Sequence, residues 1–291
     1  MVADTGITTK PVSGTAAGVP FLALPPATGD ARAPLVLGLH AFEPPRAEAA
    51  LAGAVPMASL PAWRVYLGLP LFGARLPEGG VHEINHRGER DYLVELFGPV
   101  VEEAAAELHS VVSELRAAFP VTDTPVGLVG VGAGASAVLL ALAERRTPVG
   151  AAAVVNPVVD PALVVTARER RTGTPYQWTD RAQLARARLD FDDRADEIAR
   201  GHVPLLVVNG GLDEVVDPER GGALLTALAA RTPGHALRHI VVPDLAHAIG
   251  PEPGLEPGPL TPAGVLTDRA LTEWFHRHLT SSTQVRAGTE A

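Results

Sequence analysis

The sequence of 291 residues contains no cysteine and a single lysine, Lys10. The absence of cysteine excludes disulfide bonds, thiolate zinc sites and a cysteine nucleophile. Lysine and arginine together number 24 against 33 acidic residues, so the formal charge is −9, which argues against a nucleic-acid partner. Apolar runs are interrupted before the ~18 residues of a membrane span, and Met1 to Lys10 lack the pattern of a secretory signal. We therefore expect a cytoplasmic protein with no membrane partner, and leave homodimerisation open.

Short apolar runs alternate with helical patterns along most of the chain. Hydrophobic residues make up 46% of the sequence, enough for a substantial core. Apolar runs predict strands at 35–39, 63–67, 126–131, 151–156, 205–209 and 238–242, and apolar spacing predicts helices at 91–119, 135–145 and 268–279. This alternation predicts an α/β protein with a mainly parallel sheet and helices on both faces.

Composition also suggests boundaries within the chain. Residues 1–33 are rich in glycine, threonine and proline and are expected to form an N-terminal arm with one short strand at 20–24. Residues 34–279 are expected to form the main domain, and the segment of about 157–201, rich in arginine and aspartate, is predicted to be a small helical cap over one end of the sheet. Residues 280–291 are expected to be a flexible tail.

The glycine-rich stretch at 126–135 joins a predicted strand to a predicted helix. Residues 130–134 fit the pattern G-x-S-x-G of a nucleophile elbow, except that Gly132 occupies the serine position. The same stretch fits G-x-G-x-x-A, a dinucleotide-binding pattern in which Asp160 would contact a ribose. A third interpretation is a turn that only packs a helix on a sheet, since tight turns need small residues whatever they bind.

The residues downstream favour the elbow. Asp213 follows the predicted strand at 205–209, and His247 follows the one at 238–242. Elbow, acid and histidine in this order resemble the α/β hydrolase superfamily, of the dienelactone hydrolase and prolyl-oligopeptidase-like esterase type. The resemblance spans about residues 34–279. It implies a hydrolase fold and action on a small-molecule ester or carbonyl compound.

The resemblance also implies roles for particular residues. His247 would be the general base and Asp213 the acid that orients it, with Asp217 as a rival for the second role. The backbone N–H groups of Phe42 and Ala133 would form the oxyanion hole. His40, in the same loop as Phe42, would brace that loop or line the substrate pocket.

Gly132 is the departure from the family pattern, because glycine has no side chain to form an acyl-enzyme. Ser136 lies one turn into the following helix, so it is a poor substitute. Three interpretations stay open. The histidine–aspartate dyad acts by proton transfer or through an activated water, as in a lyase or cyclase; the protein only binds a ligand; or the glycine was introduced into an ordinary serine hydrolase.

A second motif, His82 to His86, matches the zinc-binding pattern H-E-x-x-H. Its flanks are polar and rich in glycine, so we expect a solvated loop and no metal site. Glu102, Glu103 or Glu107 would be the third ligand if the zinc interpretation were right.

The predicted cap supplies candidates for the substrate pocket. Tyr176 and Trp178 are expected to line it, because substrates of this fold enter above the carboxyl ends of the strands. Arginines of the cap, namely Arg168, Arg170, Arg171 and Arg181, would meet a carboxylate or form a solvated helix face. The expected partner is a small molecule, and no cofactor is implied.

Overall fold

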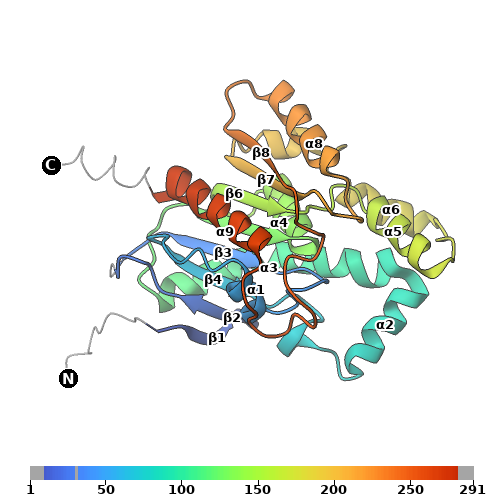
Figure 1. Cartoon of the computed structure of the whole chain (residues 1–291), viewed down its shortest axis with the longest axis horizontal. Helices are drawn as coiled ribbons and strands as arrows, with labels where there is room; N and C mark the ends of the chain where they lie inside the picture. Colours follow the sequence, from blue (N-terminus) through green and yellow to red (C-terminus); the bar gives the residue numbers. More distant parts are fainter. Residues whose placement is uncertain (1–9, 30–31, 281–291) are drawn as a thin grey trace.

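The computed structural model describes residues 10–29 and 32–280, and its centre is an eight-stranded sheet (Figure 1). The strands are β1 (Val12–Ala16), β2 (Val19–Leu24), β3 (Leu35–Leu39), β4 (Trp63–Leu67), β5 (Val126–Val131), β6 (Val149–Val155), β7 (Leu205–Gly210) and β8 (Leu237–Val242). Their order across the sheet is β1-β2-β4-β3-β5-β6-β7-β8, and β3 to β8 are all parallel. The predicted sheet type is confirmed, and every residue of β5 and β7 is buried, as expected of strands covered on both sides.

Helices cover both faces of the sheet. They are α1 (Glu48–Ala54), α2 (Gly80–Asp91), α3 (Gly98–Ala118), α4 (Ala133–Glu144), α5 (Ala162–Thr172), α6 (Asp180–Leu189), α7 (Ala195–Ala199), α8 (Pro218–Arg231) and α9 (Pro262–Phe275). Helices α1 and α9 pack on one face, where Leu51 and Phe275 are fully buried; α3, α4 and α8 pack on the other, with Leu108 and Leu139 (Figure 1). Among the described residues, no helix combines the length and the apolar character that crossing a bilayer requires.

The first part of the chain contains two strands, so the prediction of a single strand at 20–24 was wrong. β1 and β2 form an antiparallel hairpin, and β2 pairs with β4, which makes both strands part of the main sheet. The turn consists of Ala17 and Gly18, whose φ values of 50° and 81° match the tight turns that suit a hairpin. β1 was missed because it is a mostly exposed edge strand with little apolar pattern. Residues 1–9 and 30–31 of the expected arm, and 281–291 of the expected tail, lie outside the described residues.

The helix predicted for 91–119 is divided near its start. A π-helical segment, Tyr92–Phe97, precedes α3. Pro99 accounts for the change, because it has no N–H to donate to the carbonyl four residues earlier and is best placed in the first turn of a new helix.

The segment 157–201 carries α5, α6 and α7. Helices α5 and α6 lie beyond one end of the sheet, beside α2 (Figure 1), and α6 contacts the π-helical segment. Helix α7 instead packs against α4 and α8. The last helix, α9, begins earlier than predicted, because Thr261 caps it by accepting a hydrogen bond from the Gly264 N–H (3.0 Å).

Candidate active site

The turn between β5 and α4 has the geometry of a nucleophile elbow. Gly132 lies at its apex with φ of 53° and ψ of −116°, a conformation that residues with a side chain rarely adopt. A Cβ added to Gly130 would lie 2.3 Å from the carbonyl oxygen of Gly134, and a Cβ added to Gly134 would lie 2.3 Å from that of Leu39. The two outer glycines therefore let α4 pack directly against β3 and β5.

We expect Gly134→Ala to lower the free energy of unfolding by about 3 kcal/mol, because the new methyl group must push backbone apart. Guanidinium unfolding followed by circular dichroism measures the change. Gly201→Ala is the matched control, since a Cβ at Gly201 would approach nothing closer than 3.4 Å. Equal stability of the two variants would contradict this account of the elbow.

Asp213 lies in the turn after β7, and its side chain is completely buried. Its Oδ1 accepts hydrogen bonds from the N–H groups of Val215 and Val216, both at 2.8 Å, and its Oδ2 contacts His247 Nδ1 at 2.8 Å. The two backbone donors hold the carboxylate in one orientation. The remaining oxygen is thereby directed at the histidine ring.

The loop that carries His247 is held in place by Asn156, a residue that the sequence analysis did not single out. Asn156 Nδ2 donates to the carbonyl groups of Ala246 (2.7 Å) and His247 (3.1 Å), and its Oδ1 accepts from the Gly210 N–H (2.7 Å). One buried amide thus joins the end of β6, the end of β7 and the histidine loop. In the sequence, Asn156 could have been recognised as a polar residue at the end of an apolar strand.

His247 Nε2 faces the apex of the elbow. A Cβ on Gly132 would lie 3.7 Å from this nitrogen, and Glu43 Oε2 lies 3.7 Å from it. Gly132, His247 and Asp213, which are far apart in the sequence, are therefore neighbours in the fold. Glu43 is a further acidic group at this point. It was missed, although it directly follows Phe42.

The pKa of His247 is raised above its ordinary value of 6.5. Burial lowers this pKa, but the hydrogen bond to Asp213 and the negative charges of Glu43 and Asp213 together outweigh burial. The two carboxylates therefore stabilise the protonated imidazole, which is what a general base needs after it has accepted a proton.

Asp217 and Ser136, the alternative candidates for the acid and for the nucleophile, have other hydrogen-bond partners. Asp217 caps α8, with Oδ1 accepting a hydrogen bond from the Glu219 N–H (2.9 Å). Ser136 is buried within α4, and its hydroxyl donates to the carbonyl of Val158 (2.9 Å). Neither side chain has a hydrogen bond to His247 in the described part of the chain.

The loop after β3 lies against the elbow, as shown by the 3.1 Å between Ala41 Cβ and the position of a Cβ on Gly132. The N–H of Ala41 donates to the carbonyl of Pro45 (3.2 Å), whereas that of Phe42 has no acceptor among the described residues. The N–H of Ala133 opens α4, where the first donors of a helix have no acceptor within it. Phe42 and Ala133 thus offer two backbone donors beside Gly132.

His40 does not line the cavity, so its assignment to the substrate pocket was wrong. It is fully buried, with Nε2 accepting from the Leu69 N–H (3.0 Å) and Nδ1 contacting the carbonyl of Ala41 (2.8 Å). Burial, opposed only by that second hydrogen bond, lowers its pKa to about 4. His40 is therefore a neutral residue that braces the loop.

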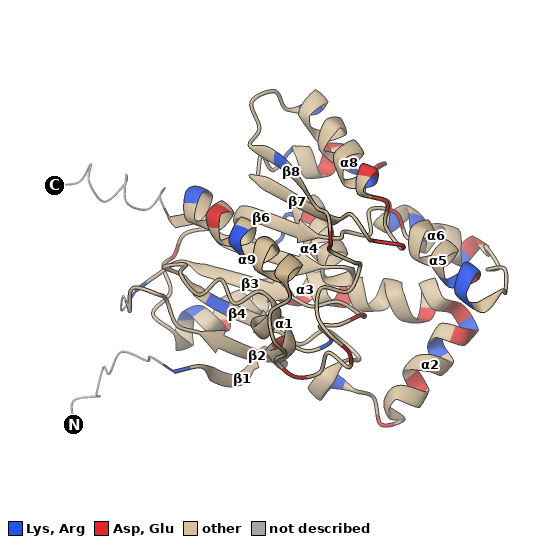
Figure 2. Ribbon diagram, in the orientation of Figure 1, with Lys and Arg blue, Asp and Glu red and all other residues tan. Residues whose placement is uncertain are grey.

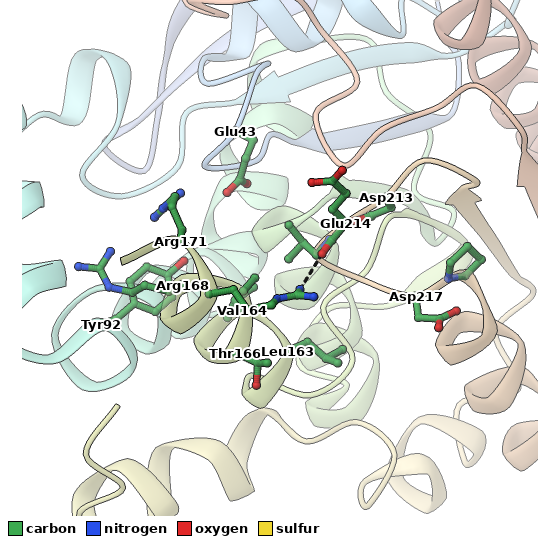
Figure 3. A pocket seen from close by; sticks show the side chains of 14 residues that line it. Glu43, Tyr92, Leu163, Val164, Thr166, Arg168, Arg171, Asp213, Glu214 and Asp217 are labelled. Atoms are coloured by element: carbon green, nitrogen blue, oxygen red, sulfur yellow. Dashed lines mark hydrogen bonds between the residues drawn. The ribbon is translucent and has the colours of Figure 1, made fainter. Parts of the chain in front are cut away.

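A cavity of about 910 Å³ opens beside the dyad (Figure 3). The loop after β3 contributes Glu43 and the π-helical segment contributes Tyr92. The other residues come from α5 and from the turn after β7: Leu163, Val164, Thr166, Ala167, Arg168, Arg170, Arg171, Asp213, Glu214, Val215, Asp217 and Pro218.

Tyr176 and Trp178 are absent from the lining of this cavity, so the prediction that they line it was wrong. The Tyr176 hydroxyl donates to Asp91 Oδ1 (2.5 Å), and the Trp178 ring packs edge-on against Tyr176, with 5.0 Å between the ring centres. These residues fasten the cap to the start of the π-helical segment. Arg181, on α6, is exposed and also lies outside the cavity.

Asp160, the candidate ribose ligand of the dinucleotide interpretation, is engaged elsewhere. Its two oxygens form an ion pair with Arg186 (2.9 and 2.7 Å), and Oδ1 also accepts from the Ala162 N–H at the start of α5 (2.9 Å). The carboxylate therefore joins α5 to α6.

His82 and His86 lie on α2, so the prediction of a loop at this motif was wrong. Both side chains are exposed, and Glu83 forms an ion pair with Arg87 (2.8 Å) that stabilises the helix. Within residues 10–29 and 32–280, no three histidine, aspartate or glutamate side chains form a group suited to a metal ion.

The described geometry can be compared with known proteins. The model of the prolyl oligopeptidase family matches residues 101–255, which include Gly132, Asp213 and His247. No curated protein sequence matches the chain.

Solved structures of α/β hydrolases share the fold. TT1662 from Thermus thermophilus is 22% identical, with a TM-score of 0.65 over 91% of this chain and 97% of its own. Est1E from Butyrivibrio proteoclasticus is 14% identical, with a TM-score of 0.59 over 93% of this chain and 99% of its own. The acylaminoacyl peptidase of Pyrococcus horikoshii is 15% identical, with a TM-score of 0.63 over 93% of this chain but 42% of its own.

Proposed function

The chain belongs to the prolyl oligopeptidase family of α/β hydrolases, and on that premise we propose that it hydrolyses a small-molecule ester with water as the nucleophile. Its family and fold are those of an enzyme of the esterase and peptidase type. The observation that carries the proposal is the direction of His247, whose Nε2 is 3.7 Å from the position of a Cβ on Gly132. The base thus faces the point at which a nucleophile attacks in this fold.

In the proposed reaction the substrate carbonyl oxygen accepts hydrogen bonds from the N–H groups of Phe42 and Ala133. Neutral His247 takes a proton from water as the water oxygen bonds to the carbonyl carbon. Asp213 stabilises the imidazolium that results, and the two N–H groups stabilise the oxyanion. The bond to the alcohol oxygen then breaks, and His247 Nε2 returns its proton to that oxygen. The products are an acid and an alcohol.

Esters fit this route better than amides do. Without a serine there is no covalent intermediate to divide the reaction into two easier steps. The leaving group must depart from the tetrahedral adduct that water forms, and an alkoxide leaves such an adduct more readily than an amide anion does. For this reason we place the substrate among esters rather than peptides.

The proposal is tested by the pH dependence of p-nitrophenyl acetate hydrolysis. Because His247 must be neutral to accept a proton and its pKa is raised, kcat/KM should increase with pH through a midpoint above 6.5. Glu43→Gln removes a negative charge that raises this pKa, so the midpoint should move to lower pH.

The matched control is Glu214→Gln, which removes a carboxylate that lines the same cavity but is not among the causes of the His247 shift. Its midpoint should equal that of the unmodified chain. A pre-steady-state burst of p-nitrophenol, with a stable acyl adduct in the intact mass of the unmodified chain, would contradict attack by water.

A further inference from the structure

One wall of the cavity carries guanidinium groups that have no carboxylate partner. Arg168, Arg171 and Tyr92, here called the arginine wall, lie together in Figure 3. Neither Arg168 nor Arg171 forms an ion pair with any described residue, whereas Arg186, Arg188 and Arg194 of the cap do. Arg168 instead lies over the Tyr92 ring, 5.2 Å from its centre. Two charged donors thus face the cavity with unused hydrogen-bonding capacity.

The Tyr92 hydroxyl adds a third donor to this wall. It has no hydrogen bond to any residue in the described part of the chain. Burial and the nearby charge of Glu43 raise its pKa, against the opposing effect of Arg168 and Arg171, so it keeps its proton. A partly buried hydroxyl and two guanidinium groups, all without acceptors, are together suited to an anionic ligand.

The opposite wall is acidic. Figure 3 shows Asp213, Glu214 and Asp217 on the side away from the arginine wall. Arg170 is the exception among the arginines, because its Nη2 donates to the carbonyl of Glu214 (2.8 Å) and joins α5 to the Asp213 turn. With Glu43 included, four carboxylates face three guanidinium groups, so a ligand with one negative charge fits better than one with two.

We propose that the substrate is an ester that also bears a free carboxylate, and that Arg168, Arg171 and Tyr92 bind this carboxylate while the ester carbonyl lies at Phe42 and Ala133. The proposal rests on the proposed function for the identity of the reacting group. The cavity extends from the arginine wall to the two carboxylates of the dyad region, because Glu43 and Asp213 both line it and both approach His247. The arginine wall would set specificity, and the dyad would carry out the reaction.

The test uses unreactive mimics, so that binding is measured apart from turnover. Levulinate and its longer homologues carry a methyl ketone in place of the ester and a free carboxylate at the far end. Their primary amides are neutral but otherwise matched. Isothermal titration of the unmodified chain should show, for at least one chain length, an acid that binds roughly tenfold or more tightly than its amide. This preference should fall with added salt.

Variants assign the preference to the arginine wall. Arg171→Gln and Arg168→Gln should each remove most of it, and Tyr92→Phe part of it, whereas Arg181→Gln on the neighbouring α6 should leave it intact. The amides should bind all four variants equally well, which shows that the cavity is preserved. The proposal would be overturned if no acid of the series bound more tightly than its neutral counterpart. It would also be overturned if this preference survived both Arg168→Gln and Arg171→Gln. Stronger competition by methyl phosphate than by acetate would overturn the choice of a carboxylate.

Failure of this inference and failure of the proposed function give different results. If keto acids bind through Arg168 and Arg171 but the chain hydrolyses no ester, the carboxylate site stands and the reaction is wrong. If esters are hydrolysed with His247 dependence but without preference for a free carboxylate, the reaction stands and the arginine wall has no role in specificity.

Discussion

Gly132→Ser is expected to form a covalent acyl-enzyme with p-nitrophenyl acetate and to increase its hydrolysis by on the order of 10³-fold or more. A Cβ at this position lies 3.7 Å from His247 Nε2, so the serine oxygen, one bond further, can reach hydrogen-bonding distance. Stopped-flow absorbance should show a burst of p-nitrophenol close to the enzyme concentration. Intact mass should show the acetyl adduct.

The same substitution should reduce stability. Serine must adopt the positive φ of Gly132, which costs about 1–3 kcal/mol, and its Cβ would lie only 3.1 Å from that of Ala41. Gly132→Ala is therefore the matched control: it carries the same strain without the hydroxyl, so it should be equally destabilised and show no burst. A folded Gly132→Ser chain without a burst, or a burst that survives His247→Ala in the same chain, would contradict the elbow assignment.

The second large effect is expected from His247→Ala in the unmodified chain. Loss of the general base should reduce kcat for p-nitrophenyl acetate by about 10²- to 10⁴-fold. The effect should fall on kcat more than on KM, because in the proposed reaction His247 acts on the water and the leaving group rather than on the bound ester. Steady-state kinetics across a range of ester concentrations separate the two parameters.

His109→Ala is the control for this experiment, because His109 is an exposed residue of α3. It should behave like the unmodified chain. Turnover that is unchanged by His247→Ala would remove the dyad from the mechanism. Absence of turnover in the unmodified chain, together with tight binding of the keto acids, would instead indicate a protein that only binds its ligand.

The buried strands could be predicted from the sequence because burial on both faces leaves a continuous apolar run. The runs at 35–39, 126–131 and 205–209 correspond closely to β3, β5 and β7. β1 could not be predicted in this way, because an exposed edge strand need not be apolar. The break near Tyr92 depends on Pro99, whose effect on the preceding turn is clear only once the helix is known to continue through it.

The candidate site residues also differ in whether the sequence pattern alone could place them. The proximity of His247 and Asp213 could be predicted because the ends of adjacent parallel strands meet at one edge of a sheet, so their positions follow from topology. Tyr176 was misassigned because its hydroxyl bonds to Asp91, 85 positions away in the sequence, and no local pattern reports such a contact. Glu43 directly follows Phe42, and Asn156 is the polar residue that ends the strand predicted at 151–156, so both positions could have been recognised from the sequence.

The tight packing around the elbow restricts how this protein can change over time. Positions 130 and 134 are closed to any larger residue, because even a methyl group would meet main-chain atoms, whereas at position 132 the nearest atom would be the Ala41 side-chain methyl at 3.1 Å. A single substitution, Gly132→Ser, therefore separates the present chain from one with a hydroxyl facing its histidine. Of the three glycine positions in this turn, 132 is the one at which selection for faster ester cleavage could act.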